Sequence, residues 1–261
     1  MTTSIFSRCA WSPKETRFGL VMLFFALLAF ALPPFSQPQN YHHFADDRSF
    51  FGLTRAMDVL SNFGFLLAGA WGLAALVLRK AHLGSVMACS LGVFFSGVLL
   101  TALGSAYYHS APQDARLVWD RLPMTLAFAG TCGALGCARV GAKAGFISLA
   151  ASLCYGVASI LVWQSTGNLT PYAVMQFGGL AWVAVAWVAG KRGSFDLPWG
   201  PLLGFYLAAK IFEALDTVLY TASSHFVSGH TVKHLLSALA AASFARAIWN
   251  LRSPIASKTQ G

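Results

Sequence analysis

The chain from residue 57 onward consists of long apolar runs separated by short polar stretches. A helix needs roughly 17 to 25 mostly apolar residues to cross a bilayer, and each run is close to that length. No stretch alternates apolar and polar residues for long enough to indicate a β-sheet. The pattern predicts an all-α, polytopic membrane helix bundle with a seven-helix core. The predicted spans are residues 57–78, 85–108, 117–140, 144–163, 171–189, 201–220 and 228–249.

A shorter apolar run at residues 18–32 precedes this core and ends at Pro33-Pro34. Basic residues lie before it, and Ala29-Phe30-Ala31 is a small-residue pattern near its end. These features also fit a cleaved signal peptide. We favour a retained extra N-terminal hydrophobic helix, which would serve as a signal anchor, because the basic part is long and prolines directly follow the cleavage position.

The composition excludes a soluble domain. Of the 261 residues, 56% are hydrophobic and 10% are charged, and the mean hydropathy is +0.60. In a soluble protein the net charge of +9 would suggest a nucleic-acid partner. Here the basic residues lie mostly in short loops, where membrane topology explains them, so we expect neither nucleic acid nor an obligate protein partner. We expect the cysteines to be small buried apolar residues and not disulfides or ligands: Cys9, Cys89, Cys132, Cys137 and Cys154.

Lys and Arg are distributed unequally between the two sides of the predicted membrane map. The side that holds the N-terminus carries Arg8, Lys14, Arg17, Arg79, Lys80, Arg139, Lys143, Lys191, Arg192, Arg246, Arg252 and Lys258. The opposite side carries only Arg48, Arg55, Arg116 and Arg121. Since positive residues accumulate on the cytoplasmic side, both termini are predicted to be cytoplasmic.

The predicted organisation has four parts. An N-terminal basic segment with the hydrophobic helix covers residues 1–34, and a polar loop on the non-cytoplasmic side covers 35–56. The seven-span core covers 57–249, and a C-terminal tail covers 250–261.

Three histidines are predicted to lie at the non-cytoplasmic end of the core, where ionisable residues are costly and usually functional. His230 and His234 open the last span four residues apart, which places them roughly 40° apart around a helix axis, so both can face one metal ion. His109 ends the second core span at the same side of the map. We predict a zinc site of these three residues, with the fourth position left to water as in catalytic sites. The alternative is that the histidines only hydrogen-bond other helices.

Ser105 and Asp120 are the candidate catalytic residues beside this site. Ser105 lies four residues before His109 and hence on the same helical face, where its hydroxyl could steady an oxyanion. Asp120 begins the next span and could take a proton from the attacking water. The alternatives are a serine bonded to its own helix backbone and a first-turn acid that interacts with the helix dipole and Arg121.

Other polar groups lie near the same end. Asp58, Ser61 and Asn62 start the first core span, and we favour a helix-packing network for them over a wall of the site. A second set shares one face of the sixth span, and mutual ion pairing would reduce the cost of its burial: Lys210, Glu213 and Asp216. Of these, Asp216 lies nearest the site side. The remaining histidines are expected to be solvated: His42, His43, His82 and His225.

The pattern resembles a known family. Ser105-x-x-x-His109, Asp120 eleven residues later and His230-x-x-x-His234 occur in a seven-span core opened by Asp58-Val59-Leu60-Ser61-Asn62. This arrangement, over residues 45 to 249, closely resembles the alkaline ceramidase family. That family belongs to a superfamily with the adiponectin and progestin receptors and the GPI-anchor remodelling hydrolases. The first core motif and Trp119-Asp120-Arg121-Leu122-Pro123 look like those of bacterial members.

The resemblance implies a zinc-dependent hydrolase that cleaves the N-acyl amide of ceramide-like sphingolipids to a sphingoid base and a fatty acid. By this resemblance His109, His230 and His234 would bind zinc, Ser105 would lie beside it, and Asp120 would act on the water. The partner would be a membrane lipid substrate. The membrane would be the bacterial inner membrane, with the active site toward the non-cytoplasmic side.

The sequence departs from the family at a second metal site. Animal members hold calcium with an acidic N-terminal segment and a glutamate of the first core helix, and Arg55 occupies that glutamate's position here. Asp46 and Asp47 remain as oxygen ligands for calcium. The hydrophobic run at 18–32 is a second departure.

Three other functions remain open from the sequence. The same site could hydrolyse another lipid amide or ester, or the chain could be a receptor-like, non-catalytic protein with a structural zinc. A haem-binding electron carrier would use intramembrane histidines as well. The clustering of the metal-candidate histidines at one face, with no second pair across the bilayer, argues against haem.

Overall fold

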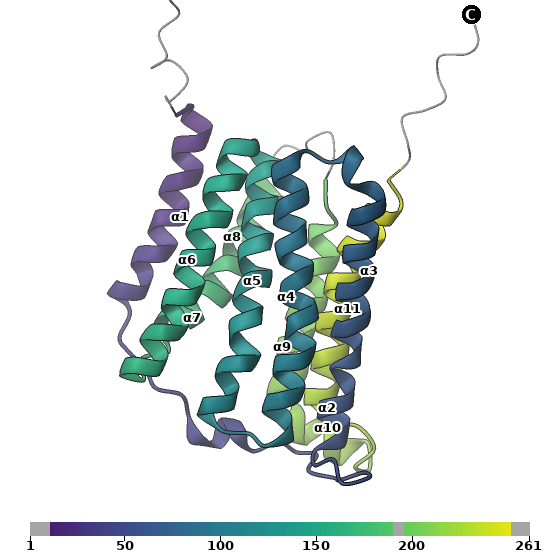
Figure 1. Ribbon diagram of the computed structural model, residues 1–261. Coiled ribbons are helices and arrows are strands. Elements are labelled where there is room, and N and C mark those ends of the chain that lie inside the picture. The colour runs from purple at the N-terminus through teal and green to yellow at the C-terminus, as the bar shows by residue number, and fades with distance from the viewer. Residues whose placement is uncertain (1–10, 190–195, 252–261) are drawn as a thin grey trace, which may run out of the picture.

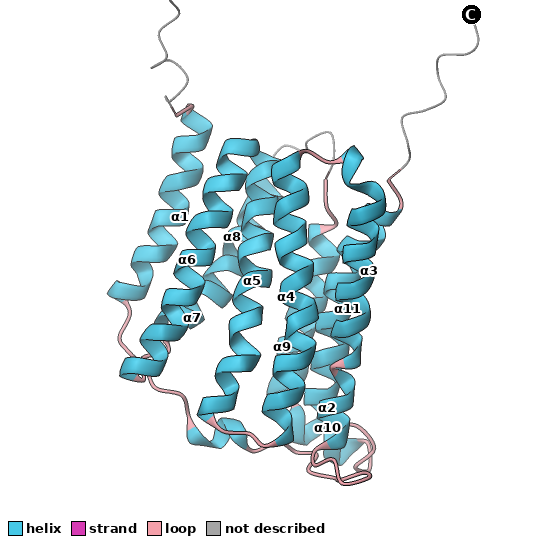
Figure 2. Ribbon diagram, viewed as in Figure 1, coloured by secondary structure: helices cyan, strands magenta, loops and turns pink. Residues whose placement is uncertain are grey.

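The described part of the chain, residues 11–189 and 196–251 of a computed structural model, is a bundle of helices that contains no β-strand (Figures 1 and 2). The all-α prediction is confirmed for these residues. The elements are α1 (Pro13–Ala31), η2 (Gln39–His42), α2 (Ala56–Ser61), α3 (Phe63–Arg79), η3 (Lys80–His82), α4 (Ser85–Ser110), α5 (Asp114–Arg139), α6 (Ala142–Thr166), α7 (Thr170–Ala173), η4 (Val174–Gly178), α8 (Gly179–Ala189), α9 (Trp199–Ala214), α10 (Asp216–Ala222) and α11 (Gly229–Trp249).

In the described part of the chain, four helical segments are long and apolar enough to cross a membrane: Ala56–His82, Ser85–Ser110, Ala142–Thr166 and Thr170–Val188. Their outer faces carry large apolar side chains that no part of the described chain covers, among them Val77, Leu103 and Val188. A contiguous apolar surface of this kind is unusual for a soluble monomer and normal for a surface that faces lipid. These features indicate a multi-pass membrane protein.

Three of the predicted spans are helical but not continuous α-helices. Asn62 separates α2 from α3, and its side-chain amide donates to the carbonyls of Asp58 and Val59 at 2.8 and 3.3 Å, in competition with the helix ladder. The fifth range contains a π-helical turn, η4. Leu215 separates α9 from α10. The interruptions at Asn62 and Leu215 both lie at the end of the bundle that holds the histidines.

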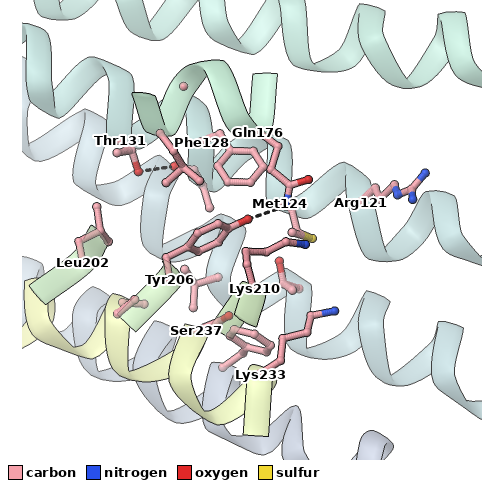
Figure 3. A pocket seen from close by; sticks show the side chains of 18 of the residues that line it. Arg121, Met124, Phe128, Thr131, Gln176, Leu202, Tyr206, Lys210, Lys233 and Ser237 are labelled. Carbon is pink, nitrogen blue, oxygen red and sulfur yellow. Dashed lines mark hydrogen bonds between the residues drawn. The ribbon is translucent and has the colours of Figure 1, made fainter. Parts of the chain in front are cut away.

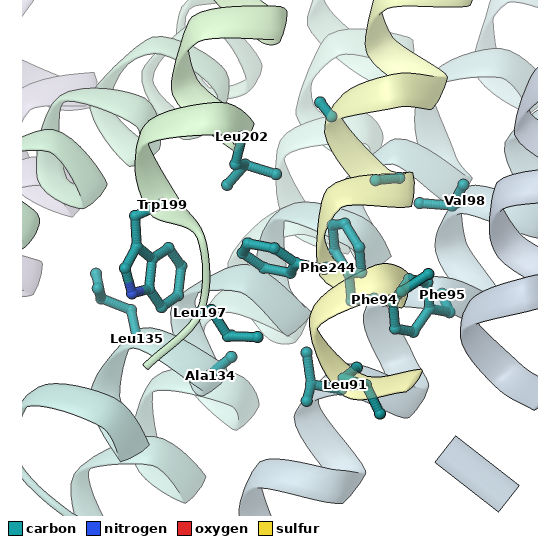
Figure 4. Close-up of a cluster of buried hydrophobic side chains, with 14 of the residues drawn as sticks. Leu91, Phe94, Phe95, Val98, Ala134, Leu135, Leu197, Trp199, Leu202 and Phe244 are labelled. Atoms are coloured by element: carbon teal, nitrogen blue, oxygen red, sulfur yellow. The ribbon is translucent and has the colours of Figure 1, made fainter. Parts of the chain in front are cut away.

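The helices surround a central space. α3 packs between α4 and α11, α4 packs on α5, α11 packs on α9, and α8 contacts both α5 and α9. α6 covers the outer face of α5 (Figure 1). The main apolar core occupies the half of the bundle where α9 begins, and it includes Trp199, Phe94, Phe95 and Phe244 (Figure 4). The opposite end, where α4 turns into α5, holds buried polar residues beside a smaller apolar cluster that includes Tyr108, Leu117 and Trp163.

The predicted N-terminal hydrophobic helix is present as α1, at the edge of the bundle beside α6, α7 and α8 (Figure 1). It begins at Pro13, before the apolar run, because Ser12 and Glu15 form a reciprocal capping box. Phe18 packs edge-on against Trp182 with ring centroids 4.8 Å apart.

Several residues named from the sequence lie outside the described part: Arg8, Cys9, Lys191, Arg192 and the tail from Arg252 onward, which includes Lys258. Among the described cysteines Cys132 is buried and Cys137 is half-buried, whereas Cys89 and Cys154 are exposed. The expectation of burial was wrong for these two, because their positions on α4 and α6 face away from the neighbouring helices. All four are free thiols.

The contact between α4 and α5 depends on Gly104. A Cβ at this position would collide with the carbonyl oxygen of Trp119 and would lie 2.7 Å from its carbonyl carbon. The glycine therefore allows the backbone of α4 to touch the first turns of α5, as small residues do between membrane helices. Since Ser105 follows Gly104 and Asp120 follows Trp119, this contact also brings the two candidate catalytic residues together.

We predict that Gly104→Ala destabilises the protein by about 1–3 kcal/mol, because the added methyl group forces α4 away from α5. Thermal unfolding in detergent, monitored by circular dichroism, should show a lower midpoint. Gly92→Ala is the matched control, since it lies on the same helix and a Cβ added there would have nothing within 4 Å. An unchanged midpoint for Gly104→Ala would contradict the close contact.

Candidate metal centre

The three predicted histidines meet at one point near the end of the bundle. One ring nitrogen from each of His109, His230 and His234 lies within 4.8 Å of the others. The side chains are 1–3% exposed, so they are shielded from solvent. In the described part of the chain this is the one group of three or more His, Cys, Asp or Glu residues close enough to share a metal ion. The prediction that these residues could hold a metal is confirmed.

The donor set fits a zinc-sized ion. Nε2 of His109 and Nε2 of His230 face each other at 3.2 Å. Two nitrogens bound to a tetrahedral zinc at 2.0–2.1 Å would be roughly 3.3 Å apart, so this pair has the spacing that one ion needs. Nδ1 of His109 is buried without a hydrogen-bond partner among the described residues. Three imidazoles with no thiolate or carboxylate among them suit zinc, but copper, iron and nickel also accept such ligands.

Ser61 orients His234. The Ser61 hydroxyl donates to the carbonyl of Asp58 at 2.9 Å, so its oxygen is left to accept from Nδ1–H of His234, 2.7 Å away. This bond places the proton of His234 on Nδ1 and leaves Nε2 free as a ligand. Partners of this kind fix the tautomer and the ring orientation of metal-binding histidines.

Asp58 fastens the short helix α2 to the start of α11. Its Oδ1 accepts hydrogen bonds from the hydroxyls of Thr231 at 2.9 Å and Ser228 at 3.3 Å. Ser228 is also the N-cap of α11 and accepts from the backbone N–H of Thr231. Since His230 lies between these two residues, the network that holds α2 on α11 also holds this ligand in place.

Asp216 ties the start of α11 to the polar loop. Its Oδ1 accepts from the backbone N–H of His230 at 2.8 Å, and its Oδ2 accepts from that of Ala45 at 2.9 Å. Gly229 is necessary here, because a Cβ would collide with the carbonyl oxygen of Phe212 and lie 2.7 Å from Cα of Asp216. The carboxylate thus acts on His230 through the backbone and does not line the metal cluster with its own oxygens.

Asp120 and Ser105 lie together beside the cluster. Both are buried, at 8% and 1% exposure, and the Ser105 side chain interacts with the Asp120 carboxylate. Both line the same cavity as His234. The structure therefore places a carboxylate and a hydroxyl on the wall of the cavity that one metal-candidate ligand, His234, also lines.

The polar loop covers the cluster. The ring of Phe44 lies edge-on against His109 and His230, with centroid distances of 4.7 and 4.6 Å. The loop is held by Ala45 through Asp216 and by Arg48, whose guanidinium donates to the carbonyl of Phe226 at 3.0 Å. Phe44 thus separates the histidines from solvent on this side.

Asp46 and Asp47, the two calcium ligands suggested by the resemblance, do not form a shared site in the structure. The buried carboxylate of Asp46 accepts two guanidinium hydrogen bonds from Arg48, at 2.8 and 2.5 Å. Burial alone would raise the pKa of the Asp46 carboxyl, but the hydrogen bonds and charge of Arg48 outweigh it, and the pKa is lowered. Asp47 is exposed. A calcium ion at Asp46 would have to displace Arg48.

His42 was expected to be solvated, and this expectation was wrong. Its side chain is 11% exposed. Nδ1 lies 3.0 Å from the hydroxyl of Tyr108, and Nε2 lies 3.2 Å from Oδ1 of Asp114. The loop folds back onto α4 and α5, and the sequence spacing gave no sign of these long-range partners. His43 and His225 are exposed, as expected.

Lys233 is the residue near the site that the sequence patterns did not assign. Its ammonium lies 3.3 Å from Nε2 of His230 and 2.8 Å from Oε1 of Glu213. Glu213 also pairs with Lys210. The expected ion pairing of Lys210 and Glu213 is therefore present, and Lys233 joins it from α11. A lysine between two histidines inside an apolar run was the signal that could have identified it.

A cavity that one of the three histidines, His234, lines lies between the helices, and Figure 3 shows side chains from its wall. Its polar end is lined by Ser105, Asp120, Arg121, Lys210, Glu213, Lys233 and His234. Its apolar part is lined by Phe94, Val98, Leu180, Val183, Leu202 and Ala241. Tyr206 and Gln176 lie on the wall between these parts and share a hydrogen bond of 2.6 Å (Figure 3). The cavity thus combines one charged end with an apolar interior.

Comparisons with protein-family models, curated proteins and solved structures found no match to this chain.

We predict about one metal ion per chain in protein purified in detergent, and its loss in His109→Ala and in His230→Ala, because each substitution removes one of three ligands. Elemental analysis by mass spectrometry measures the content and identifies the metal. His43→Ala is the control, since His43 is exposed and outside the cluster. Metal-free wild-type protein that is well folded and has been offered zinc would refute the site.

We predict that Ser61→Ala weakens metal affinity by about 10- to 100-fold, because His234 loses the acceptor that orients its ring. Competition with a zinc chelator of known affinity measures the change. Ser110→Ala, at the end of α4 and outside this network, is the control. Equal affinities for Ser61→Ala and wild type would show that the hydrogen bond does not prepare the ligand.

Proposed function

We propose that this protein is a zinc-dependent membrane amidohydrolase that cleaves the N-acyl amide of ceramide-like sphingolipids to a sphingoid base and a fatty acid. The observation that carries the proposal is the joining of two features in one cavity. His234 of the three-histidine cluster and the acid Asp120 both line the cavity, and the same cavity has an apolar interior suited to a hydrocarbon chain. The resemblance to alkaline ceramidases supports the choice of reaction.

The proposal includes a membrane arrangement. All seven core ranges would cross the bilayer, with α1 as an additional retained helix. Both termini would be cytoplasmic, following the excess of Lys and Arg on that side. The metal cluster would then open toward the non-cytoplasmic side of a bacterial inner membrane.

His109, His230 and His234 would hold the metal, and their three-ligand set leaves a coordination position for water or substrate. A bound zinc ion supplies Lewis acidity, which polarises a carbonyl and makes water a nucleophile at neutral pH. Other residues of the chain orient the histidine ligands and shield them from solvent. Ser61 sets the tautomer of His234, and Phe44 limits access of bulk water.

Asp120 would act as the general base and then as the general acid. Its carboxylate takes a proton from the attacking water as the new C–O bond forms, and it returns that proton to the amide nitrogen as the C–N bond breaks. The hydroxyl of Ser105 would donate a hydrogen bond to the oxyanion. The products are a fatty acid and an amine, and one water molecule is consumed.

The acyl chain would lie in the apolar part of the cavity. Phe94 and Val98 line it from α4, Leu202 lines it from α9, and Ala241 lines it from α11. The chain would pass from the bilayer into this apolar space without entering water, so the fit of the chain to the cavity, and not its removal from water, would decide which chain is preferred.

We predict that Asp120→Asn lowers turnover by about 10²- to 10⁴-fold and leaves the metal bound, because only the proton-transfer group is lost. His234→Ala should abolish both turnover and metal binding. Release of fatty acid from a panel of ceramides, other lipid amides and lipid esters, measured by mass spectrometry, tests both variants and identifies the substrate.

The same panel separates the alternatives. Cleavage of another amide or ester in place of ceramide would keep the mechanism and change the substrate. Binding of lipids with less than one turnover per chain would favour a receptor-like protein with a structural zinc. Full turnover by metal-free protein would contradict the proposed metal-dependent hydrolysis.

A further inference from the structure

The charges at the polar end of the cavity do not balance. Lys210, Lys233 and Arg121 supply three positive charges, and Glu213 and Asp120 supply two negative charges. A bound divalent metal would add further positive charge. Uncompensated charge in a low-dielectric site is costly, so this end of the cavity favours an anion.

The two lysines share one carboxylate. Glu213 binds Lys233 through Oε1 at 2.8 Å and Lys210 through Oε2. The side chains of the three residues are only partly enclosed, at 16%, 27% and 15% exposure for Lys233, Lys210 and Glu213. All three line the cavity, and in Figure 3 the two labelled lysines extend in the same direction. Ammonium groups have three donors each, so both keep donors for a ligand.

Arg121 adds positive charge to the same cavity, and in Figure 3 its side chain extends away from the two lysines. It is 5% exposed, lines the same cavity, and NH1 has no hydrogen-bond partner in the described part of the chain. Its guanidinium is held over the rings of Trp163 at 4.6 Å and Tyr172 at 5.0 Å, and it also donates to Gln37. No carboxylate is paired with it among the described ion pairs. A buried arginine with a free donor is a natural partner for a carboxylate or phosphate.

We propose that Lys210 and Lys233, with the added positive charge of Arg121, make the polar end of the cavity a binding site for an anionic group, so that long-chain acyl amides whose head group carries a carboxylate or a phosphate are bound more tightly than neutral ones such as ceramide. The apolar interior takes the acyl chain, and the cationic end takes the anion beside the metal cluster. The choice of an amide rests on the proposed function, whereas the binding of an anionic amphiphile does not.

The alternative is that Lys210, Glu213 and Lys233 only tie α9 to α11. A structural tie of that kind would affect stability but would not distinguish an anionic ligand from a neutral one. The ratio of the two affinities therefore separates these roles.

The test uses the full chain in nanodiscs and three probes with the same acyl chain: an acyl amino acid, an acyl amide with a phosphate monoester, and a neutral acyl ethanolamine. Binding is measured with their non-hydrolysable sulfonamide analogues, and turnover with the amides themselves. We expect wild type to bind one or both anionic probes roughly 10- to 100-fold more tightly than the neutral one, as for hydrogen bonds to charged groups. The two anionic probes show whether carboxylate or phosphate is preferred.

Lys210→Met should reduce this preference about tenfold or more and leave the neutral probe unchanged, whereas Lys210→Arg should retain it. Lys80→Met, in the exposed η3 turn, is the matched control for loss of a positive charge. Lys233→Met, with its metal content measured, provides a second variant in case Lys210→Met does not fold. Its loss of preference would support the site in the same way.

Failure of this inference differs from failure of the proposed function. Preferential binding of anionic probes that depends on Lys210, without any amide hydrolysis, would support the anion site and remove the proposed reaction. Amide hydrolysis with equal affinity for anionic and neutral probes, in wild type and Lys210→Met alike, would keep the reaction and overturn the anion site.

Discussion

Two histidine ring nitrogens that face each other at 3.2 Å are the contact around which one end of this bundle is organised. One belongs to the last turn of α4 and the other to the first turn of α11, and these helices have few direct contacts of their own. Their relative position is set by neighbours. α3 packs between them, the Asp216 carboxylate holds the start of α11, and Asp58 fastens α2 to the same turn. A small displacement of any of these elements would separate the nitrogens.

Burial explains why so many polar residues at this end are bonded to one another. In an apolar surrounding an unpaired polar group costs several kcal/mol, so each must find a partner within the protein. Asp58 has two hydroxyl donors, Ser61 has His234, and Glu213 has two lysines. Not every buried polar atom at this end is paired: Oδ2 of Asp58, Oδ1 of Asn62, Nδ1 of His109 and NH1 of Arg121 have no hydrogen-bond partner in the described chain.

The sequence predicted the site better than it predicted the surroundings of the site. The spacing of His230 and His234 on one helix and the topology that put His109 level with them were sufficient to predict the cluster. The contacts of Ser61, His42 and Phe44 were not predictable, because each joins residues that are far apart in the chain. Lys233 lies in the last predicted span, but its ion pair depends on Glu213 from another helix, which the sequence of that span could not show. A hydropathy pattern likewise could not show that Cys89 and Cys154 face outward.

The sequence by itself determined that the chain is helical and membrane-embedded and that its histidines gather at one end, because apolar length and helical spacing are local properties. The tertiary structure decided which of those residues contact one another. Close approach at Gly104 brings Ser105 to Asp120, and the joining of α9 with α11 makes two lysines share one carboxylate. Such contacts depend on the distance between helix axes and on their rotation, which are set by packing over the whole bundle and not by any one segment.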